Sequence, residues 1–343
     1  MDEQISAEWL TQRLRGNGHL PHAEVSSVSV AATHKHHLEL TVSYSGEAEG
    51  MPSRMILKRY DPGHPHGWRE GLLYRDVVPT MPDPPTPVCY DVSLIADSGQ
   101  AHILLEDLSQ THFNIRPGHT RLLTPATFEP VLDTYARFHT YWWEHDTIGR
   151  ADMLAPCGLG VSHEAKGEGH IRENERFFHD TALPKWIDAH GDDRTTSRQN
   201  TWERAISAWA RLFEERTASG TALTLIQGDA HMGNVLMPHQ EGRPVLIDWE
   251  GLTPGIGLWD LSRLLLCYQF PPGMRRELER VLLPRYQRQT EAAGIEGYGI
   301  DNCESDYRLC VLANLPHVLV WGDEVYMEST MAAFSDWDCE GLL

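Results

Sequence analysis

The chain has 343 residues and carries 49 acidic against 29 basic side chains, which gives a formal net charge of −20 at neutral pH. A surface this acidic argues against nucleic acid or an anionic membrane as a partner, and no apolar run is long enough to cross a bilayer. The length suffices for two lobes with sizeable cores, while an acidic N-terminus unlike a signal peptide and six cysteines without a CxxC pair predict a cytoplasmic protein with reduced thiols.

The first 106 residues contain several short runs in which apolar and polar residues alternate, which is typical of strands. Clusters of Gly, Pro and Asp separate the runs, as in a sheet with tight turns. The expected elements are a helix over 5–15, strands over 25–30, 38–44 and 55–60, a helix over 68–78, and strands over 88–95 and 101–105. We therefore expect a small antiparallel sheet with one key helix inserted between its strands.

Beyond residue 106 the apolar residues recur every three to four positions, which is the spacing of helices with one buried face. The expected helices cover 128–142, 172–190, 200–218, 258–270, 274–293 and 306–320. The polar stretch 191–197 is predicted to be a loop between two of them. The predicted fold class is therefore α+β, with a small N-terminal lobe over 1–106 and a larger, mainly helical lobe over 107–343.

Two short segments near residue 240 carry the most specific chemical signal. Asp229 and Asn234 lie on a loop that contains two glycines and is flanked by apolar segments, and Asp248 and Glu250 follow a short apolar strand. Oxygen-bearing side chains on two turns joined by a hairpin-sized connection suit a hard cation such as Mg²⁺ together with one catalytic carboxylate. Phosphoryl transfer from a nucleotide requires that combination.

Each of these residues has an expected role. Asp229 is the candidate for the group that orients a substrate hydroxyl and accepts its proton. Asn234 and Asp248 are the expected metal ligands, because both offer the oxygen atoms that Mg²⁺ prefers. Glu250 is either a further ligand or one that acts through water. Each residue alone is ordinary turn chemistry, but Gly-Asp-x-His-x-x-Asn followed by Ile-Asp-Trp-Glu is far more specific.

A lysine in the N-terminal region supports the same interpretation. The chain has only four lysines among its 29 basic residues, and Lys58 lies inside an apolar strand. A compact ammonium group at that position suits the α- and β-phosphates of a nucleotide. Glu70, early in the following helix, is expected to pair with Lys58. The alternative is an edge-strand lysine that faces water.

These residues resemble those of the aminoglycoside phosphotransferase and choline kinase superfamily, which shares the protein-kinase-like fold. The resemblance covers about residues 25–320 and is strongest over 225–265, and Ile247-Asp-Trp-Glu250 is similar to the form seen in the choline kinase branch. It implies a two-lobed small-molecule kinase that uses ATP, or another nucleoside triphosphate, with Mg²⁺. The expected partner is a small-molecule hydroxyl acceptor, such as an amine-bearing sugar, an antibiotic or a choline-like alcohol, with a cationic charge left open. The oligomeric state is not predicted.

The resemblance also assigns roles residue by residue. Asp229 matches the aspartate of the catalytic loop, Asn234 and Asp248 match the two metal-binding residues, and Lys58 and Glu70 match the paired strand lysine and helix glutamate.

Three further positions follow only from the resemblance. The segment Leu104-Leu-Glu-Asp-Leu108 is similar to the interlobe hinge, whose backbone near Glu106 and Leu108 would meet adenine. Asp260 matches an aspartate that braces the catalytic loop.

Two departures from the family pattern leave a second interpretation open. Gln227 stands where the loop normally begins with His, and the expected phosphate-covering loop over 31–37 contains no glycine. The alternative is therefore a kinase-fold protein that binds a nucleotide and regulates without turnover. A weaker third interpretation is a metal-dependent hydrolase that uses His231 and Asp229. The stretch 321–328 mixes aromatic rings with carboxylates, either as a site for an organic cation or as ordinary core and surface residues.

Overall fold

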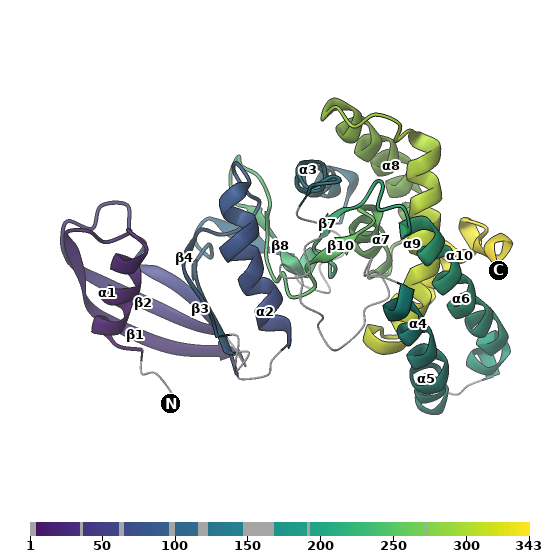
Figure 1. Cartoon of the computed structure of the whole chain (residues 1–343), viewed down its shortest axis with the longest axis horizontal. Coiled ribbons are helices and arrows are strands. Elements are labelled where there is room, and N and C mark those ends of the chain that lie inside the picture. The colour runs from purple at the N-terminus through teal and green to yellow at the C-terminus, as the bar shows by residue number, and fades with distance from the viewer. Residues whose placement is uncertain are drawn as a thin grey trace. The chain divides into compact units, whose positions relative to one another are not determined.

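The computed structural model describes residues 5–34, 37–61, 65–95, 100–115, 123–146, 168–190, 193–271 and 273–343 (Figure 1). The chain forms two compact units. The first unit comprises Met1–Phe113 and Leu236–Glu250, and the second comprises Asn114–Val235 and Gly251–Leu343. The segment Leu236–Glu250, which carries Asp248 and Glu250, therefore folds with the N-terminal residues. The predicted lobes, divided at residue 106, placed this segment with the C-terminal residues instead.

The first unit is built on the predicted antiparallel sheet. Its strands are β1 (Ala23–His34), β2 (His37–Gly46), β3 (Arg54–Tyr60), β4 (Cys89–Ile95) and β5 (Gln100–Glu106). The strand order is β1-β2-β3-β5-β4, and all neighbouring strands are antiparallel. Strand β3 lies in the middle, where Lys58 pairs with His37 on one side and Ile103 on the other. The interpretation of Lys58 as an edge-strand residue is therefore wrong.

One face of this sheet is covered by helix α1 (Ala7–Gly16) (Figure 1). The helix begins where the Ser6 hydroxyl accepts a hydrogen bond from the backbone N–H of Trp9 at 3.1 Å, the usual way to satisfy a free amide at a helix start. Its apolar side chains share a core with Met55 and Leu57 of β3. Because side chains alternate along a strand, Lys58 and Tyr60 point to the opposite face.

That opposite face receives helix α2 (Pro65–Leu72), which packs against β4 and β5 and continues through a π-helical turn over Leu73–Val77 and a 3-10 turn over Val78–Thr80. Two glycines allow a close approach. A Cβ at Gly67 would lie 2.1 Å from Cγ of Tyr60, and one at Gly71 would lie 2.3 Å from Cδ2 of Leu94. Glu70 lies between these two glycines on α2, so the close approach brings its carboxylate to the face of the sheet, beside Lys58.

A second, smaller sheet lies almost entirely in the first unit. Its strands are β6 (His112–Asn114), β8 (Val235–Pro238) and β9 (Val245–Leu246), in the order β6-β8-β9. Asp248 lies two positions after the last residue of β9, close to the end of a short apolar strand as the sequence predicted.

The second unit is mainly helical, which confirms the predicted fold class. Its helices are α3 (Pro125–Tyr141), α4 (Glu168–Phe177), α5 (Leu183–His190), α6 (Asp193–Thr217), α7 (Leu258–Leu266), α8 (Met274–Ala292), α9 (Ile300–Trp321) and α10 (Glu324–Asp336). Two short strands, β7 (Thr224–Ile226) and β10 (Thr253–Gly255), pair antiparallel beside them. All nine residues of α7 are buried, so its polar side chains must find partners inside the protein.

The predicted loop over 191–197 is wrong for most of its length. Helix α6 already begins at Asp193, and an acidic residue in the first turn of a helix is favoured by the helix dipole. Gly191 and Asp192 lie outside the described residues. In the part of the chain that the structure describes, no helix is long and apolar enough to span a membrane.

The close contact of α2 with the sheet can be tested by enlarging the two glycines. Gly67→Ala and Gly71→Ala are each expected to lower the free energy of unfolding by about 1–3 kcal/mol, since the new methyl group must displace a buried side chain. Denaturant titration measures this difference.

Gly16→Ala is the matched control, because Gly16 also lies in a helix of the first unit and an added Cβ there meets nothing within 4 Å. We expect it to be neutral or to stabilise by up to about 1 kcal/mol. Equal losses in all three variants would contradict the packing argument.

Candidate active site

In the first unit, Lys58 is the centre of a cluster of acidic groups. Its Nζ lies 2.8 Å from both carboxylate oxygens of Glu70 and 3.1 Å from Oδ1 of Asp248. Lys58 and Glu70 are buried, while the side chain of Asp248 remains 40% exposed. The predicted pairing of Lys58 with Glu70 is therefore present, and Asp248 joins it from a segment 190 residues away in the chain.

Tyr60 adds a residue that the sequence interpretation missed. Its hydroxyl lies 2.6 Å from Oε2 of Glu70 and 3.0 Å from Oε1 of Glu250. A phenol carries one hydrogen, so Tyr60 donates to one carboxylate at a time, and the shorter contact is with Glu70. The signal was present in the sequence, because Tyr60 lies two positions after Lys58 and side chains two positions apart in a strand point to the same face.

The electrostatics of this cluster follow from burial and from the crowding of carboxylates. Burial alone would lower the pKa of Lys58, but Glu70 and Asp248 outweigh it and the pKa rises above its usual value. Burial, together with repulsion from Asp248 and Glu70, raises the pKa of Glu250 to about 7. Lys58 therefore stays charged at neutral pH, whereas Glu250 is partly protonated.

The same cluster has the donor set of a hard-cation site. Oxygen atoms of Glu70, Asp248 and Glu250 all lie within 4.8 Å of one another. Carboxylates that crowd together repel one another unless a cation or proton intervenes, and Mg²⁺ prefers oxygen ligands of this kind. The residues present therefore fit a divalent cation. Asp248 also has a left-handed backbone with φ of 63°, which Asp tolerates better than most residues.

The expected hinge positions also lie in the first unit. Glu106 is the last residue of β5, and its N–H donates to the carbonyl of Val88 at 2.9 Å. The carbonyl of Leu108 accepts from the backbone of Thr111 and His112 at 3.0 and 2.9 Å. The segment is an ordered turn, and contact of Glu106 and Leu108 with adenine stays a prediction.

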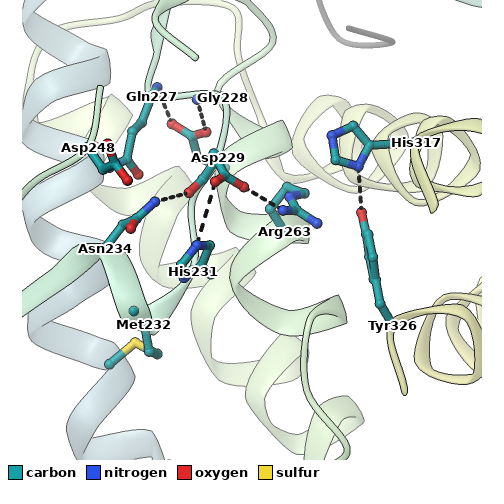
Figure 2. A network of polar contacts seen from close by, with 12 residues as sticks. Gln227, Gly228, Asp229, His231, Met232, Asn234, Asp248, Arg263, His317 and Tyr326 are labelled. Atoms are coloured by element: carbon teal, nitrogen blue, oxygen red, sulfur yellow. Dashed lines mark hydrogen bonds and ion pairs between the residues drawn. The ribbon is translucent and has the colours of Figure 1, made fainter. Parts of the chain in front are cut away.

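In the second unit, the loop that carries Asp229 is fixed by a buried carboxylate. Asp260 accepts hydrogen bonds from the backbone N–H of Gln227 at 2.8 Å and of Gly228 at 3.0 Å (Figure 2). Trp259 donates through its indole N–H to the carbonyl of Gly228 at 2.8 Å. Gly228 has φ of 85°, a conformation for which glycine is favoured. The bracing contact expected of Asp260 is therefore present.

The side chain at the head of this loop is held as well. The Tyr135 hydroxyl donates to Oε1 of Gln227, and both residues are buried. His139 lies 3.1 Å from Oδ2 of Asp260 and 3.1 Å from the hydroxyl of Tyr286. Gln227 thus provides a hydrogen-bonding side chain where the family pattern has His, and the loop is braced on its backbone and its side chain.

The Asp229 carboxylate lies at the centre of the loop network in Figure 2. Its Oδ1 is 2.6 Å from Nη2 of Arg263, and its Oδ2 is 3.5 Å from Nε2 of His231. The side chain of Asn234 donates to the backbone carbonyl of Asp229 at 3.0 Å. The structure therefore brings Asp229 and Asn234 together, as predicted, and adds Arg263.

These contacts determine the ionisation of Asp229. Burial alone would raise its pKa, but His231 and Arg263 outweigh burial and hold the pKa well below its usual value. The carboxylate is therefore ionised at neutral pH and can accept a hydrogen bond from a hydroxyl. Such a group orients the hydroxyl first and takes its proton late, as suits a loose phosphoryl-transfer transition state.

Two other predicted features are only partly described. In the expected phosphate-covering loop, β1 and β2 reach His34 and His37, and residues 35–36 lie outside the described residues. In the stretch 321–328 the ring of Tyr326 lies 4.7 Å from the guanidinium carbon of Arg263. Glu328 pairs with Arg198 at 3.2 Å. The aromatic face of Tyr326 is thus in contact with a cation of the chain itself.

The fold resembles that of solved small-molecule kinases. Ethanolamine kinase from Plasmodium vivax matches with a TM-score of 0.55 and 9% identity over 93% of this chain and 85% of that chain. Choline kinase from Cryptosporidium parvum matches with a TM-score of 0.52 and 12% identity over 98% of this chain and 97% of that chain. An amicoumacin kinase in complex with AMP-PNP, Ca²⁺ and Ami matches with a TM-score of 0.50 and 12% identity over 92% of this chain and 87% of that chain. A comparison with curated proteins gives no sequence match.

These similarities define a protein of the kinase-like fold used by small-molecule kinases, which confirms the predicted architecture. A model of the phosphotransferase enzyme family, APH, matches residues 41–293. The chain belongs to this family. The predicted enzyme class, a phosphotransferase, is confirmed with it.

The bridging role of Tyr60 can be tested through stability. Tyr60→Phe removes a hydrogen bond to a buried carboxylate, and we expect the free energy of unfolding to fall by about 1.5–3 kcal/mol. Tyr44→Phe is the control, because the Tyr44 hydroxyl donates to the neutral carbonyl of Pro52 at 2.8 Å. That variant should lose about 1 kcal/mol. Denaturant titrations that show no larger loss for Tyr60→Phe would contradict the bridge.

Proposed function

We propose that this phosphotransferase moves the γ-phosphoryl group of ATP, or of another nucleoside triphosphate, to a hydroxyl of a small molecule in the cytoplasm. The observation that carries the proposal is the Asp229 carboxylate, which contacts Arg263 and His231 and lies on a loop held by Asp260. The Lys58–Glu70 pair supports it from the first unit.

The residues divide the work as follows. Lys58, held by Glu70, binds the α- and β-phosphates, and the backbone at Glu106 and Leu108 contacts the nucleobase. Asp229 orients the acceptor hydroxyl and takes its proton as the new P–O bond forms and ADP leaves. The positions proposed to hold Mg²⁺ are Asp248 and Asn234, with Glu250 as a further ligand.

The bound cation would neutralise charge on the phosphates.

The acceptor is proposed to be a small alcohol, and an amine-bearing one is the first class to test. The kinases of similar fold act on choline, ethanolamine and amicoumacin by their names. The net charge of −20 is compatible with a cationic acceptor. The acceptor can be identified by measuring ADP release with a panel of choline, ethanolamine, amino sugars and antibiotics.

A regulator without turnover is the second candidate, since Gln227 replaces the usual His. The bonds that hold Gln227 and Gly228 argue for turnover, because they fix the loop as catalysis needs. Binding of MgATP without phosphate transfer to any acceptor in the panel would favour the regulator instead.

The role of Asp229 is tested by Asp229→Asn. Phosphate transfer should fall about 10²- to 10⁴-fold, since the hydroxyl loses its proton acceptor, while MgATP binding stays within about 2-fold. Asp188→Asn, at an exposed carboxylate on α5 of the same unit, is the control and should keep full activity. Full activity in Asp229→Asn would rule out the proposed mechanism.

Asp248→Asn tests the metal site and suits the left-handed backbone there, which Asn tolerates. MgATP affinity should fall about 10- to 100-fold through loss of one charged ligand, whereas ATP binding in EDTA should change little. Titration calorimetry measures both. Asp76→Asn, at a surface ion pair with Arg75, should behave like wild type. An unchanged Mg²⁺ dependence in Asp248→Asn would contradict the assignment.

A further inference from the structure

Arg263 is a buried cation that the sequence interpretation did not consider. It lies on α7, its side chain is 6% exposed, and its Nη2 contacts Oδ1 of Asp229 at 2.6 Å. A guanidinium stays charged at any working pH, and a buried charge is costly to separate from its partner. The contact with Asp229 is therefore a fixed feature of the second unit.

The guanidinium of Arg263 packs against a tyrosine of α10 that is hydrogen-bonded to α9. The ring of Tyr326 on α10 lies 4.7 Å from the guanidinium carbon, within cation–π range. The Tyr326 hydroxyl donates to Oδ1 of Asn314 on α9. It also lies 3.3 Å from Nδ1 of His317, as Figure 2 shows. Asn314 in turn donates to the hydroxyl of Ser262 on α7 at 2.9 Å. These contacts fix the Tyr326 ring, which in turn packs against Arg263.

The two oxygens of Asp229 are not equivalent. Oδ1 is taken by Arg263, whereas Oδ2 has only the longer 3.5 Å contact with His231 among the contacts seen in the described residues. The backbone of Asp229 is held independently by Asn234. The side chain of Asp229 is nevertheless 48% exposed. The accessible part of this carboxylate is therefore presented in one fixed rotation.

We propose that Arg263 is a positioning residue that reserves Oδ1 of Asp229 and thereby makes Oδ2 the atom that receives the acceptor hydroxyl. The inference rests on the proposed function, since it assigns a task to the same carboxylate. The hydroxyl donates to Oδ2 before transfer, and its proton moves to Oδ2 as the oxygen bonds to phosphorus. Arg263 touches neither substrate and acts through Asp229.

Kinetics separates this role from a purely structural one. Arg263→Met should lower kcat on the order of 10- to 100-fold, the effect of a catalytic group displaced by about 1 Å, with KM for ATP within about 2-fold. Arg263→Lys should recover part of the loss, because it keeps the charge without the planar fork. Tyr326→Phe keeps the aromatic ring against Arg263 and should therefore lower kcat less than Tyr326→Leu does.

Arg216→Met is the matched control. Arg216 is another arginine of the second unit, paired with Asp306 at 2.7 and 2.8 Å. Its loss should lower stability while leaving kcat of the folded fraction unchanged. Circular dichroism and thermal unfolding report folding for every variant, and if Arg263→Met does not fold, the comparison of Arg263→Lys with wild type decides.

The deciding measurement repeats Arg263→Met in the Asp229→Asn background. A residue that acts only through Asp229 should then change kcat less than about 2-fold, because its partner is already lost. The inference would be overturned if Arg263→Met lowered kcat by the same factor in both backgrounds, or if it raised only the KM for ATP and left kcat unchanged. A wild type that transfers no phosphate would overturn the proposed function with it. An active wild type with a dead Asp229→Asn and a fully active Arg263→Met would overturn the inference alone.

Discussion

The second unit depends on one buried carboxylate, that of Asp260. It accepts two backbone hydrogen bonds from the loop and contacts His139, and it is fully buried. A charge in such a place is tolerated only while its hydrogen bonds persist. The loop at Gln227 and Gly228 is therefore tied to α7. Asp229 follows the second of these amides, so its position is inherited from Asp260, and Arg263, one helical turn further along α7, pairs with it.

The first unit obeys the same constraint with the opposite sign of charge. Lys58 is a buried cation in the middle of a sheet, and it persists there because Glu70 and Asp248 face it. Gly67 and Gly71 let α2 approach closely enough for that contact. In both units a buried charge acts as a positioning device: an unpaired charge would destabilise the fold, and the paired one fixes the group that function needs.

The sequence predicted the parts of this account that depend on local patterns. The alternation around Lys58 placed it in a strand, and the clustered oxygen ligands near residue 240 identified the chemistry. Tyr60 and Arg263 obeyed patterns equally visible, a period of two in a strand and a spacing of three from Asp260 on a helix. Two of their partners, Glu250 for Tyr60 and Asp229 for Arg263, could not be predicted from these patterns, because they lie 190 and 34 residues away and are brought near only by tertiary packing. The short strand β7 was missed as a strand because three residues cannot show a period.

The structural features favour turnover over nucleotide binding alone. A protein that only binds nucleotide has no need of an ionised carboxylate held on a doubly braced loop, yet Asp229 is held in that way. Gln227, the main departure from the family pattern, is hydrogen-bonded to Tyr135 and leaves the loop intact.

The central claim is phosphoryl transfer to a small-molecule hydroxyl, and ³¹P NMR of the reaction products tests it most directly. Wild-type protein, ATP, Mg²⁺ and the acceptor panel should yield a new phosphate monoester resonance in equal amount with ADP. Release of inorganic phosphate without an ester would support a hydrolase. ATP that is bound by the protein but stays unchanged would support a regulator. Either result would contradict the account.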